Sequence, residues 1–291
     1  LPEVDIIFSA DLSANRIKMI TNTGEYQLMG EPGHEFPGVP EFKAETKVPL
    51  DGALLKRIIQ KTVFSVSADE LRPAMTGVLL QFMDTDLRAV ATDGHRLVRY
   101  HIKDIQMKGL RRDVVIPGKA LSLILRALED GSHTLHLDGT HIQFQFGTTT
   151  LTSRLIEEKY PNYESVIPGD NTKILTIDRD TVLAAVRRVA LYSSATTHQI
   201  RFSLKKDELR VAAEDVDFGG EAREKIPCSY TDEEMEIGFN SSYIIDVLSH
   251  IDDEEVVLRL STAVRAAIVS PREQRPGEDI LMLVMPVRLN S

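Results

Sequence analysis

The sequence predicts an α+β fold made of a repeated unit, in which antiparallel sheets predominate and each unit carries two helices. Several segments recur in the same order at an offset of about 125 residues. Many short runs alternate between apolar and polar side chains, as strands with one buried face do. Two longer stretches in each unit place apolar residues at helical spacing, and helices packed on antiparallel sheets are typical of the α+β class.

The first repeated segment is a short strand followed by a helix. Val48–Phe64 resembles Leu175–Leu191. An aspartate, Asp51 in one copy and Asp178 in the other, precedes the helical stretch. Aspartate at this position accepts hydrogen bonds from the free backbone amides of the first turn, so we expect an amphipathic helix to begin here in both copies.

Further segments recur later in each unit. Leu87–Asp93 returns as Leu209–Asp215, and Ile116–Leu125 returns as Phe239–Leu248. The first pair predicts a strand, and the second predicts a strand that leads into the second helix of the unit. Within the middle copy, residues 134–147 alternate on both sides of a glycine and a threonine, which predicts a hairpin.

The limits of the second helix follow from its flanking residues. We expect the helix of the middle copy to span Lys119–Leu128, because Pro117 and Gly118 stand just before it. Asp130 and Gly131 follow it, and glycine suits the end of a helix.

The N-terminal region matches only the second half of the unit. Ile17–Leu28 parallels Ile142–Ser153, and Glu35–Gly38 parallels Lys159–Asn162. The first copy therefore lacks its front, and the chain begins at Leu1 rather than at methionine. Similar units joined end to end close into a ring when the rotation between them allows it. If the molecule itself lacks the front, we expect weaker ring closure.

Composition indicates a globular protein of a reducing compartment. The net charge is -10, and Cys228 is the single cysteine, which excludes an internal disulfide and a CxxC motif. The apolar runs are far too short to cross a bilayer, and the first residues lack the basic start of a signal peptide. We therefore expect a cytoplasmic protein. The acidic balance argues against tight coating of nucleic acid, which needs many basic side chains.

Four strings of residues are specific in combination. They are Ala91–Leu97 (ATDGHRL), Lys159–Tyr163 (KYPNY), Glu236–Asn240 (EIGFN) followed by Tyr243, and Val284–Leu289 (VMPVRL). Together, and in order along nearly the whole chain, they resemble the bacterial DNA polymerase III beta sliding clamp family.

The resemblance implies the DNA-clamp fold, with residues 1–42 as the C-terminal part of domain one, 43–171 as domain two and 172–291 as domain three. It also implies a head-to-tail homodimeric ring that encircles double-stranded DNA and tethers the polymerase, the clamp loader and other replication and repair proteins. Such a clamp has no catalytic activity and no cofactor or metal. Encirclement replaces affinity and contacts only the DNA backbone, so an acidic protein can hold DNA.

In the family, partner proteins dock a short linear peptide into a groove between the second and third domains. Polar residues that can fix a peptide backbone at the rim of such a groove are Arg72, His95 and Asn240. Its apolar floor would be formed by Leu97, Met75, Val166, Val264 and Met285. Methionine also suits a site with many partners, because its side chain repacks easily. The residues that the resemblance assigns to the groove are Arg72, Met75, Thr92, Gly94, His95, Arg96, Leu97, Pro161, Val166, Thr197, Asn240, Tyr243, Val264, Leu283, Val284, Met285, Pro286 and Val287.

Any single apolar member of this set, such as Met75 or Val264, is also compatible with ordinary strand core, so only the whole set favours a groove. The chain departs from the family at three places. Ser165 and Thr197 stand where many members carry larger side chains, and Asn290–Ser291 extend past the usual terminal leucine. We expect partner preference to differ accordingly.

Two smaller sets also fit the clamp. Basic side chains on the first helix of each unit are candidates to face DNA phosphates, with a solvated helix face as the alternative; they are Lys56, Arg57, Lys61, Arg187 and Arg188. The family's subunit interface joins the last strands of domain one to the first helix of domain three. This places Tyr26 and Leu28 opposite Leu191 and Tyr192, with ordinary core as the alternative.

Two other functions stay open on the residues alone. Asp93 and His95 combine a carboxylate with an imidazole, as acid-base and metal sites do, and on a strand they would share one face. They lack the further ligands of a metal site, however, and no HExxH, GxSxG or GxxxxGK[ST] motif occurs. A peptide-binding scaffold without a DNA role would share the groove but not the ring, and retention on circular DNA separates the two.

Overall fold

The computed structural model describes residues 4–36, 38, 41–107, 109–128 and 131–289. The chain forms two compact units, residues 1–43 and 44–291. The features predicted at Pro37, Asp130 and Asn290–Ser291 lie outside the described residues.

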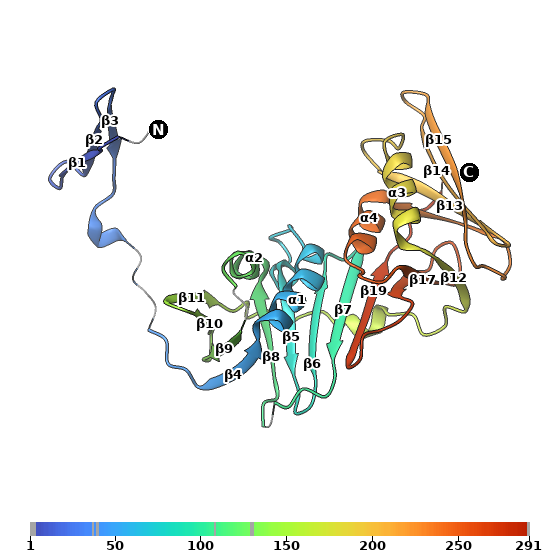
Figure 1. The fold of residues 1–291 in the computed structure, drawn as a ribbon, viewed down its shortest axis with the longest axis horizontal. Helices are drawn as coiled ribbons and strands as arrows, with labels where there is room; N and C mark the ends of the chain where they lie inside the picture. Colours follow the sequence, from blue (N-terminus) through green and yellow to red (C-terminus); the bar gives the residue numbers. More distant parts are fainter. Residues whose placement is uncertain (1–3, 37, 39–40, 108, 129–130, 290–291) are drawn as a thin grey trace. The chain divides into compact units, whose positions relative to one another are not determined.

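The larger unit runs through the same order of strands and helices twice (Figure 1). The first copy consists of β4 (Thr46–Asp51), α1 (Gly52–Thr62), β5 (Gly77–Phe82), β6 (Leu87–Thr92), β7 (Arg96–Ile102), β8 (Arg112–Pro117), α2 (Gly118–Ala127), β9 (Ser132–Leu137), β10 (His141–Phe146) and β11 (Thr149–Arg154). The second copy consists of β12 (Lys173–Asp178), α3 (Arg179–Ala190), β13 (Gln199–Lys205), β14 (Glu208–Asp215), β15 (Gly220–Pro227), β16 (Met235–Asn240), α4 (Ser241–Ser249), β17 (Glu255–Leu260), β18 (Ala267–Pro271) and β19 (Glu278–Val284). The predicted α+β class is confirmed.

The helices begin where the sequence predicts. Asp51 Oδ1 accepts a hydrogen bond from the Leu54 backbone amide at 3.0 Å, and Asp178 Oδ1 accepts one from the Thr181 amide at 2.7 Å. These bonds satisfy amides that have no partner inside the helix. The helix predicted at 119–128 runs from Gly118 to Ala127, and 134–147 forms the predicted hairpin of β9 and β10.

Each repeat forms two four-stranded sheets. One sheet of each repeat stays separate, and the other joins the corresponding sheet of the other repeat. The separate sheets have the orders β11-β10-β9-β4 and β15-β14-β13-β16. The other two halves join into one sheet with the order β12-β17-β18-β19-β7-β6-β5-β8, because β19 pairs antiparallel with β7. We call this pairing the internal joint. It runs from Glu278 opposite Ile102 to Val284 opposite Arg96.

The core of the larger unit is continuous across the two copies. Buried side chains of α1, such as Leu55 and Ile58, belong to the same apolar cluster as Val182 and Val186 of α3. α1 packs against α2, and α3 packs against α4. The division at residues 171 and 172 therefore stays a prediction that rests on the repeat, since sheet and core both continue across it.

The smaller unit is a meander of β1 (Ile7–Asp11), β2 (Arg16–Ile20) and β3 (Glu25–Met29), followed by the short 3-10 helix η1 (Gly33–Glu35). Ile17 faces Leu28 as Ile142 faces Ser153, so β2 and β3 correspond to β10 and β11. None of its described residues is buried, and the large apolar side chains of β1 and β3 are exposed.

Candidate functional site

The turn between β6 and β7 organises the surface beside the internal joint. Asp93 Oδ1 accepts hydrogen bonds from the backbone amides of His95 at 2.8 Å and Arg96 at 2.9 Å, and Gly94 has a φ of 91°. Asp93 and His95 thus lie in a tight turn. The prediction that they share a strand face is wrong, because the left-handed glycine between them ends the strand.

Gly94 brings two predicted groove residues from another segment into contact with this turn. A Cβ at Gly94 would lie 3.0 Å from Arg72 Nη1 and 3.7 Å from Met75 Cε. Both residues flank or belong to η3 (Pro73–Thr76), which follows η2 (Val63–Ser65). A side chain at position 94 would therefore push the Arg72 guanidinium aside as well as strain the backbone.

The floor of the predicted groove is the internal joint itself. Leu97 of β7 stands opposite Leu283 of β19, and both are almost fully buried. They belong to an apolar cluster with Tyr160 and Ala266, which the sequence did not single out as site residues. Tyr160 stands inside the KYPNY string and Ala266 near Val264, so neighbouring signals were present.

The apolar members divide into buried and exposed groups. Val166, Val264 and Met285 are 53%, 69% and 40% exposed, whereas Met75, Leu283 and Val284 are buried. The alternative interpretation, ordinary strand core, therefore applies to Met75, Leu283 and Val284. The three exposed apolar side chains are available to a ligand. Among the other predicted members, Thr92 is buried, Pro161 and Thr197 are exposed, and Pro286 and Val287 are intermediate.

Arg96 supports the turn from within the joint. Its Nε donates to Asp93 at 3.1 Å, its Nη2 donates to the Phe64 carbonyl at 2.8 Å, and its Nη1 pairs with Asp246 of α4. Its guanidinium also lies 4.9 Å from the centre of the Tyr243 ring. Each of the three nitrogens makes a bond within the chain, which fixes the Arg96 guanidinium beside the turn.

His95 and Asn240 complete the rim from the two copies. The His95 ring stacks on the Tyr243 ring with centroids 5.8 Å apart, and the His95 carbonyl accepts from the Met285 amide at 2.8 Å. Asn240 Oδ1 caps α4 through the Ser242 amide at 2.9 Å, and its Nδ2 donates to the Thr197 carbonyl at 3.4 Å. The capping bond holds the Asn240 side chain at the start of α4.

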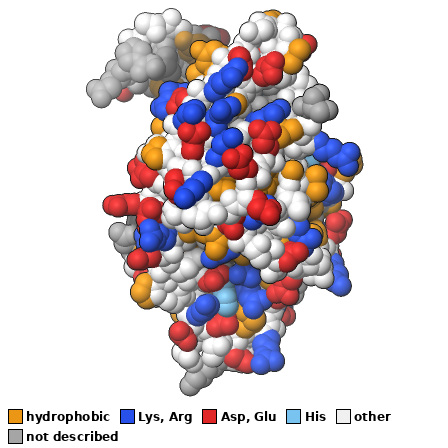
Figure 2. Space-filling view, turned by 90° about the vertical axis from the view of Figure 1, so that its right-hand side faces the viewer, with side chains coloured by type: hydrophobic (Ala, Val, Ile, Leu, Met, Phe, Trp, Pro, Cys, Tyr) orange, Lys and Arg blue, Asp and Glu red, His pale blue; other side chains and the backbone are white. Residues whose placement is uncertain are grey.

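Cavity volume does not single out this groove. A cavity of about 700 Å³ that is lined in part by residues 155–164 contains only Pro161 of the predicted groove residues. A second cavity, of about 460 Å³ over β13–β15, contains only Thr197. The face around β13–β15 is a mixed field of charges (Figure 2), with ion pairs such as Arg201–Glu236 and Lys225–Glu208. Interleaved charges of both signs do not favour a single class of ligand.

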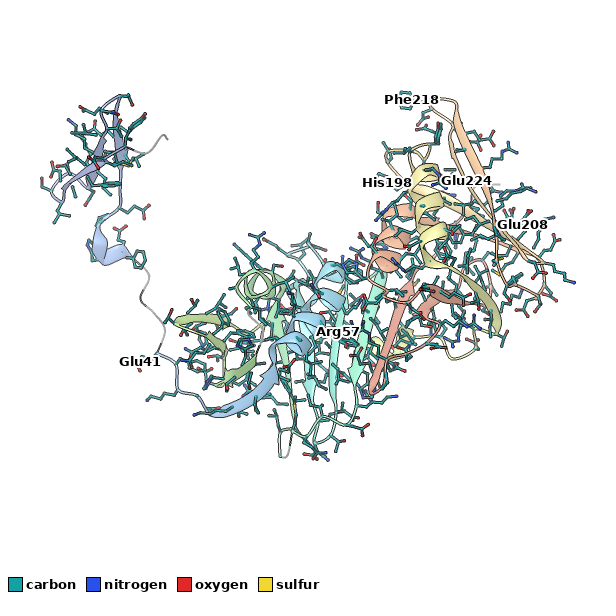
Figure 3. All side chains as sticks on the ribbon, in the orientation of Figure 1. Glu41, Arg57, His198, Glu208, Phe218 and Glu224 are labelled. Atoms are coloured by element: carbon teal, nitrogen blue, oxygen red, sulfur yellow. The ribbon has the colours of Figure 1, made fainter. Side chains whose placement is uncertain are left out.

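Two predicted DNA-facing residues instead hold the two copies together. Arg57 Nη1 pairs with Asp252 at 2.6 Å and Nη2 pairs with Glu278 at 3.0 Å. Lys61 Nζ reaches Asp252 at 2.6 Å and the His250 carbonyl at 2.5 Å. Figure 3 labels Arg57 on α1. The DNA-facing prediction is wrong for this pair. Spaced four residues apart, they share the helix face that packs on the second copy, and Lys61 is buried.

The other basic candidates remain on the surface. Lys56 is exposed, and Arg187 is exposed with one hydrogen bond, to Ser249 Oγ at 3.2 Å. Arg188 is also exposed but makes a bidentate pair with Glu224 of β15, at 2.8 Å and 2.7 Å. Lys56 and Arg187 therefore keep the freedom that a phosphate contact requires.

The predicted interface residues are exposed on their own units. Tyr26 and Leu28 lie on β3, and Leu191 and Tyr192 follow the end of α3. The core alternative is therefore wrong for all four. Exposed aromatic and aliphatic side chains of this size are typical of interface anchors.

Comparisons with known proteins agree on one family. The model for the DNA polymerase III beta subunit central domain matches residues 49–162, and the model for its C-terminal domain matches residues 164–288. The beta sliding clamp of Proteus mirabilis is 31% identical, covering 97% of this chain and 76% of the relative, and that of Chlamydia muridarum is 30% identical, covering 97% and 78%. The chain belongs to the bacterial beta sliding clamp family.

Solved structures agree with the sequence relatives. A sliding clamp from Pseudomonas aeruginosa, determined with a ligand, has a TM-score of 0.84 at 31% identity and covers 99% of this chain and 78% of its own. A clamp from Bartonella birtlesii bound to griselimycin has a TM-score of 0.85 at 29% identity, covering 98% and 77%. The chain is thus a DNA sliding clamp of replication, and sliding clamps are not enzymes.

Burial raises the pKa of the Cys228 thiol to about 11, with Asp207 and Glu208 adding to the effect, so the thiol stays protonated at neutral pH. Among the described residues, no three His, Cys, Asp or Glu side chains gather as a metal site would require. No helix in the described part of the chain is long and apolar enough to span a membrane.

Mild acid should loosen the packing between the two repeats of the larger unit. His250 stacks on Phe64 with ring centroids 3.8 Å apart, and burial lowers its pKa below the ordinary value. A lowered folded-state pKa contributes stability above the unfolded pKa, about 6.5, and this contribution is lost as pH falls through the folded value. The urea midpoint should therefore fall on acidification from about pH 7 to 5.5. His250→Phe should reduce this fall, whereas His34→Gln at an exposed site should not; equal falls in all three would contradict the assignment.

Proposed function

We propose that two copies of this chain close head to tail into a ring around duplex DNA, in the cytoplasm. The ring would hold the replicative polymerase and other replication and repair proteins on DNA through the groove at the internal joint. The proposed domains are residues 1–42, 43–171 and 172–291. The observation that carries the ring is the internal joint, because it is a head-to-tail contact between repeats.

The same joint can be repeated between chains. β19 is the last strand of the third domain, and it pairs with β7 of the second. By the repeat, β3 is the last strand of the first domain and β15 is the counterpart of β7. Both stand at sheet edges, and an open strand edge favours pairing with another strand. A heterologous contact of this kind closes a ring when the rotation fits.

Side chains near these edges favour the same contact. Tyr26 and Leu28 on β3 and Leu191 and Tyr192 beside β15 are exposed, so they are free to be buried by a second copy. Apolar burial is the dominant favourable term in most protein association.

DNA would be held by shape, with few direct contacts. Lys56 and Arg187 are the predicted basic residues that stay free of ion pairs in the described structure, and the net charge of the chain is -10. Strong salt-driven binding would need many more phosphate contacts. Encirclement requires none of them.

The groove would take an apolar ligand over the buried Leu97 and Leu283, between the exposed Val166, Val264 and Met285. The clamps from Bartonella birtlesii and Pseudomonas aeruginosa were solved bound to griselimycin, which makes this compound a suitable probe. We propose that griselimycin binds this chain at the same groove as partner peptides.

Retention on circular DNA tests the ring. A chain assembled on a closed plasmid should remain bound when salt is raised and should be released when the plasmid is cut once, because a ring slides off a free end. The Leu191→Asp, Tyr192→Asp double variant should lose retention and keep griselimycin binding. A scaffold without a DNA role would bind griselimycin and show no retention, and equal retention on linear and circular DNA would exclude encirclement.

A further inference from the structure

The turn between β14 and β15 presents an apolar tip that neither the groove nor the predicted interface set includes. Phe218 is 89% exposed and Val216 is 82% exposed. Figure 3 places Phe218 at the end of the hairpin, beyond Glu224. Two large apolar side chains exposed together on one turn form a surface that a partner can bury.

The tip is held in a defined conformation. Asp215 Oδ1 accepts hydrogen bonds from the amides of Asp217 at 3.1 Å and Phe218 at 3.2 Å, and Gly219 has a φ of 68°. A Cβ at Gly220, the first residue of β15, would lie 3.8 Å from Tyr192 Cδ1, so the predicted interface aromatic packs beside the turn end of the same hairpin. Phe218 is therefore presented by an ordered turn, and Gly220 after this turn lies beside Tyr192.

The internal joint contains the counterpart of this turn. Asp93 stands in the repeat where Asp215 stands, and its carboxylate caps the β6–β7 turn in the same way. There the turn contacts the end of β19: Arg96 faces Val284, and the His95 carbonyl accepts from the Met285 amide at 2.8 Å. A turn of this type thus meets the strand end of the next repeat.

The same register can be carried to the contact between chains. Ile268 faces Leu283 as Ile17 faces Leu28, so Met29 is the counterpart of Val284. Met29 is 72% exposed. We infer that the β14–β15 turn of one copy packs against the end of β3 in a second copy, with Phe218 on Met29 as an anchor of the subunit contact. The inference rests on the proposed ring and adds residues to its interface.

Self-association measured by sedimentation over a concentration series tests the inference. Phe218→Ala should weaken association about tenfold or more, because a buried aromatic anchor is lost, and Phe218→Trp should retain it. The matched control is Leu71→Ala, which removes a side chain that is 91% exposed in the first repeat of the same chain, away from the β14–β15 turn. It should leave association unchanged. Thermal unfolding should be the same in all variants, because these side chains are exposed.

A double-mutant cycle separates this contact from a general loss of apolar surface. If Phe218 meets Met29, the Phe218→Ala, Met29→Ala double variant should weaken association clearly less than the sum of the single changes, since one contact cannot be lost twice. Wild-type association that is insensitive to Phe218→Ala, or strictly additive effects, would overturn the inference and leave the ring standing. A wild-type chain that stays monomeric and is not retained on circular DNA would overturn both.

Discussion

Griselimycin binding should fall about ten- to hundredfold in each of the variants Val264→Asp and Met285→Asp. Both side chains are exposed, and both belong to the proposed groove. Burial of such a side chain contributes roughly 1.5–3 kcal/mol, and a carboxylate there would also lose water without gaining a partner. Titration calorimetry would measure the change.

The control for this experiment is Leu123→Asp on α2, an exposed apolar residue outside the predicted groove. It should bind griselimycin as the unaltered chain does. Because all three side chains are exposed, the urea midpoint should change little. Unaltered affinity in both groove variants would remove the groove from this surface, whatever the outcome of the DNA experiment.

Asp252→Ala should lower the free energy of unfolding of the larger unit by about 2 kcal/mol. Asp252 forms ion pairs with Lys61 and Arg57 of the first repeat and with Arg275 of its own repeat. Its removal leaves the buried Lys61 ammonium without its carboxylate. Breaking a fully buried pair costs about 3–5 kcal/mol, and the smaller figure reflects the 42% exposure of the Asp252 side chain.

Urea denaturation of three variants would assign the cause. Adding Lys61→Met to Asp252→Ala should recover much of the loss, because the stranded charge is then gone. Glu233→Ala, which removes a highly exposed partner of Lys173, should change stability by less than about 0.5 kcal/mol. If the double variant is no more stable than Asp252→Ala alone, the buried charge is not the source of the loss.

The ion pairs of Asp252 should make the contact between the two repeats sensitive to strong acid. Partial burial of Asp252 raises its pKa, but the hydrogen bonds from Lys61 and Arg57 outweigh burial, and the pKa lies below its ordinary value. A lowered carboxyl pKa contributes stability above the unfolded value and loses it as pH falls through the folded value. This loss lies at lower pH than the one expected from His250, so the two are separable in one pH series.

The predicted groove and the contact between the two repeats share side chains. His95 lies in the turn between β6 and β7 and Arg96 begins β7, and the Tyr243 ring contacts both of them from α4. Asp246, one helical turn further, pairs with Arg96. A ligand on the rim would therefore rest on side chains whose positions depend on how the two copies pack.

Much of the fold could be read from local pattern. Asp51 and Asp178 cap helices because an aspartate before an apolar helical stretch satisfies free amides wherever the helix packs. The hairpin at 134–147 follows from alternation, which depends only on neighbours in sequence. The resemblance of ATDGHRL and VMPVRL to one family led to its identification, which the comparisons confirm.

Side-chain roles that depend on distant partners could not be read in this way. Arg57 and Lys61 look like DNA contacts in sequence, yet their helix face meets Asp252, nearly two hundred residues away. Asp93 and His95 look like strand neighbours until the conformation of Gly94 turns the chain. Charge, capping and alternation are encoded locally, whereas burial and ion pairing depend on which surface folding brings opposite. For this chain, that surface is the joint between β19 and β7.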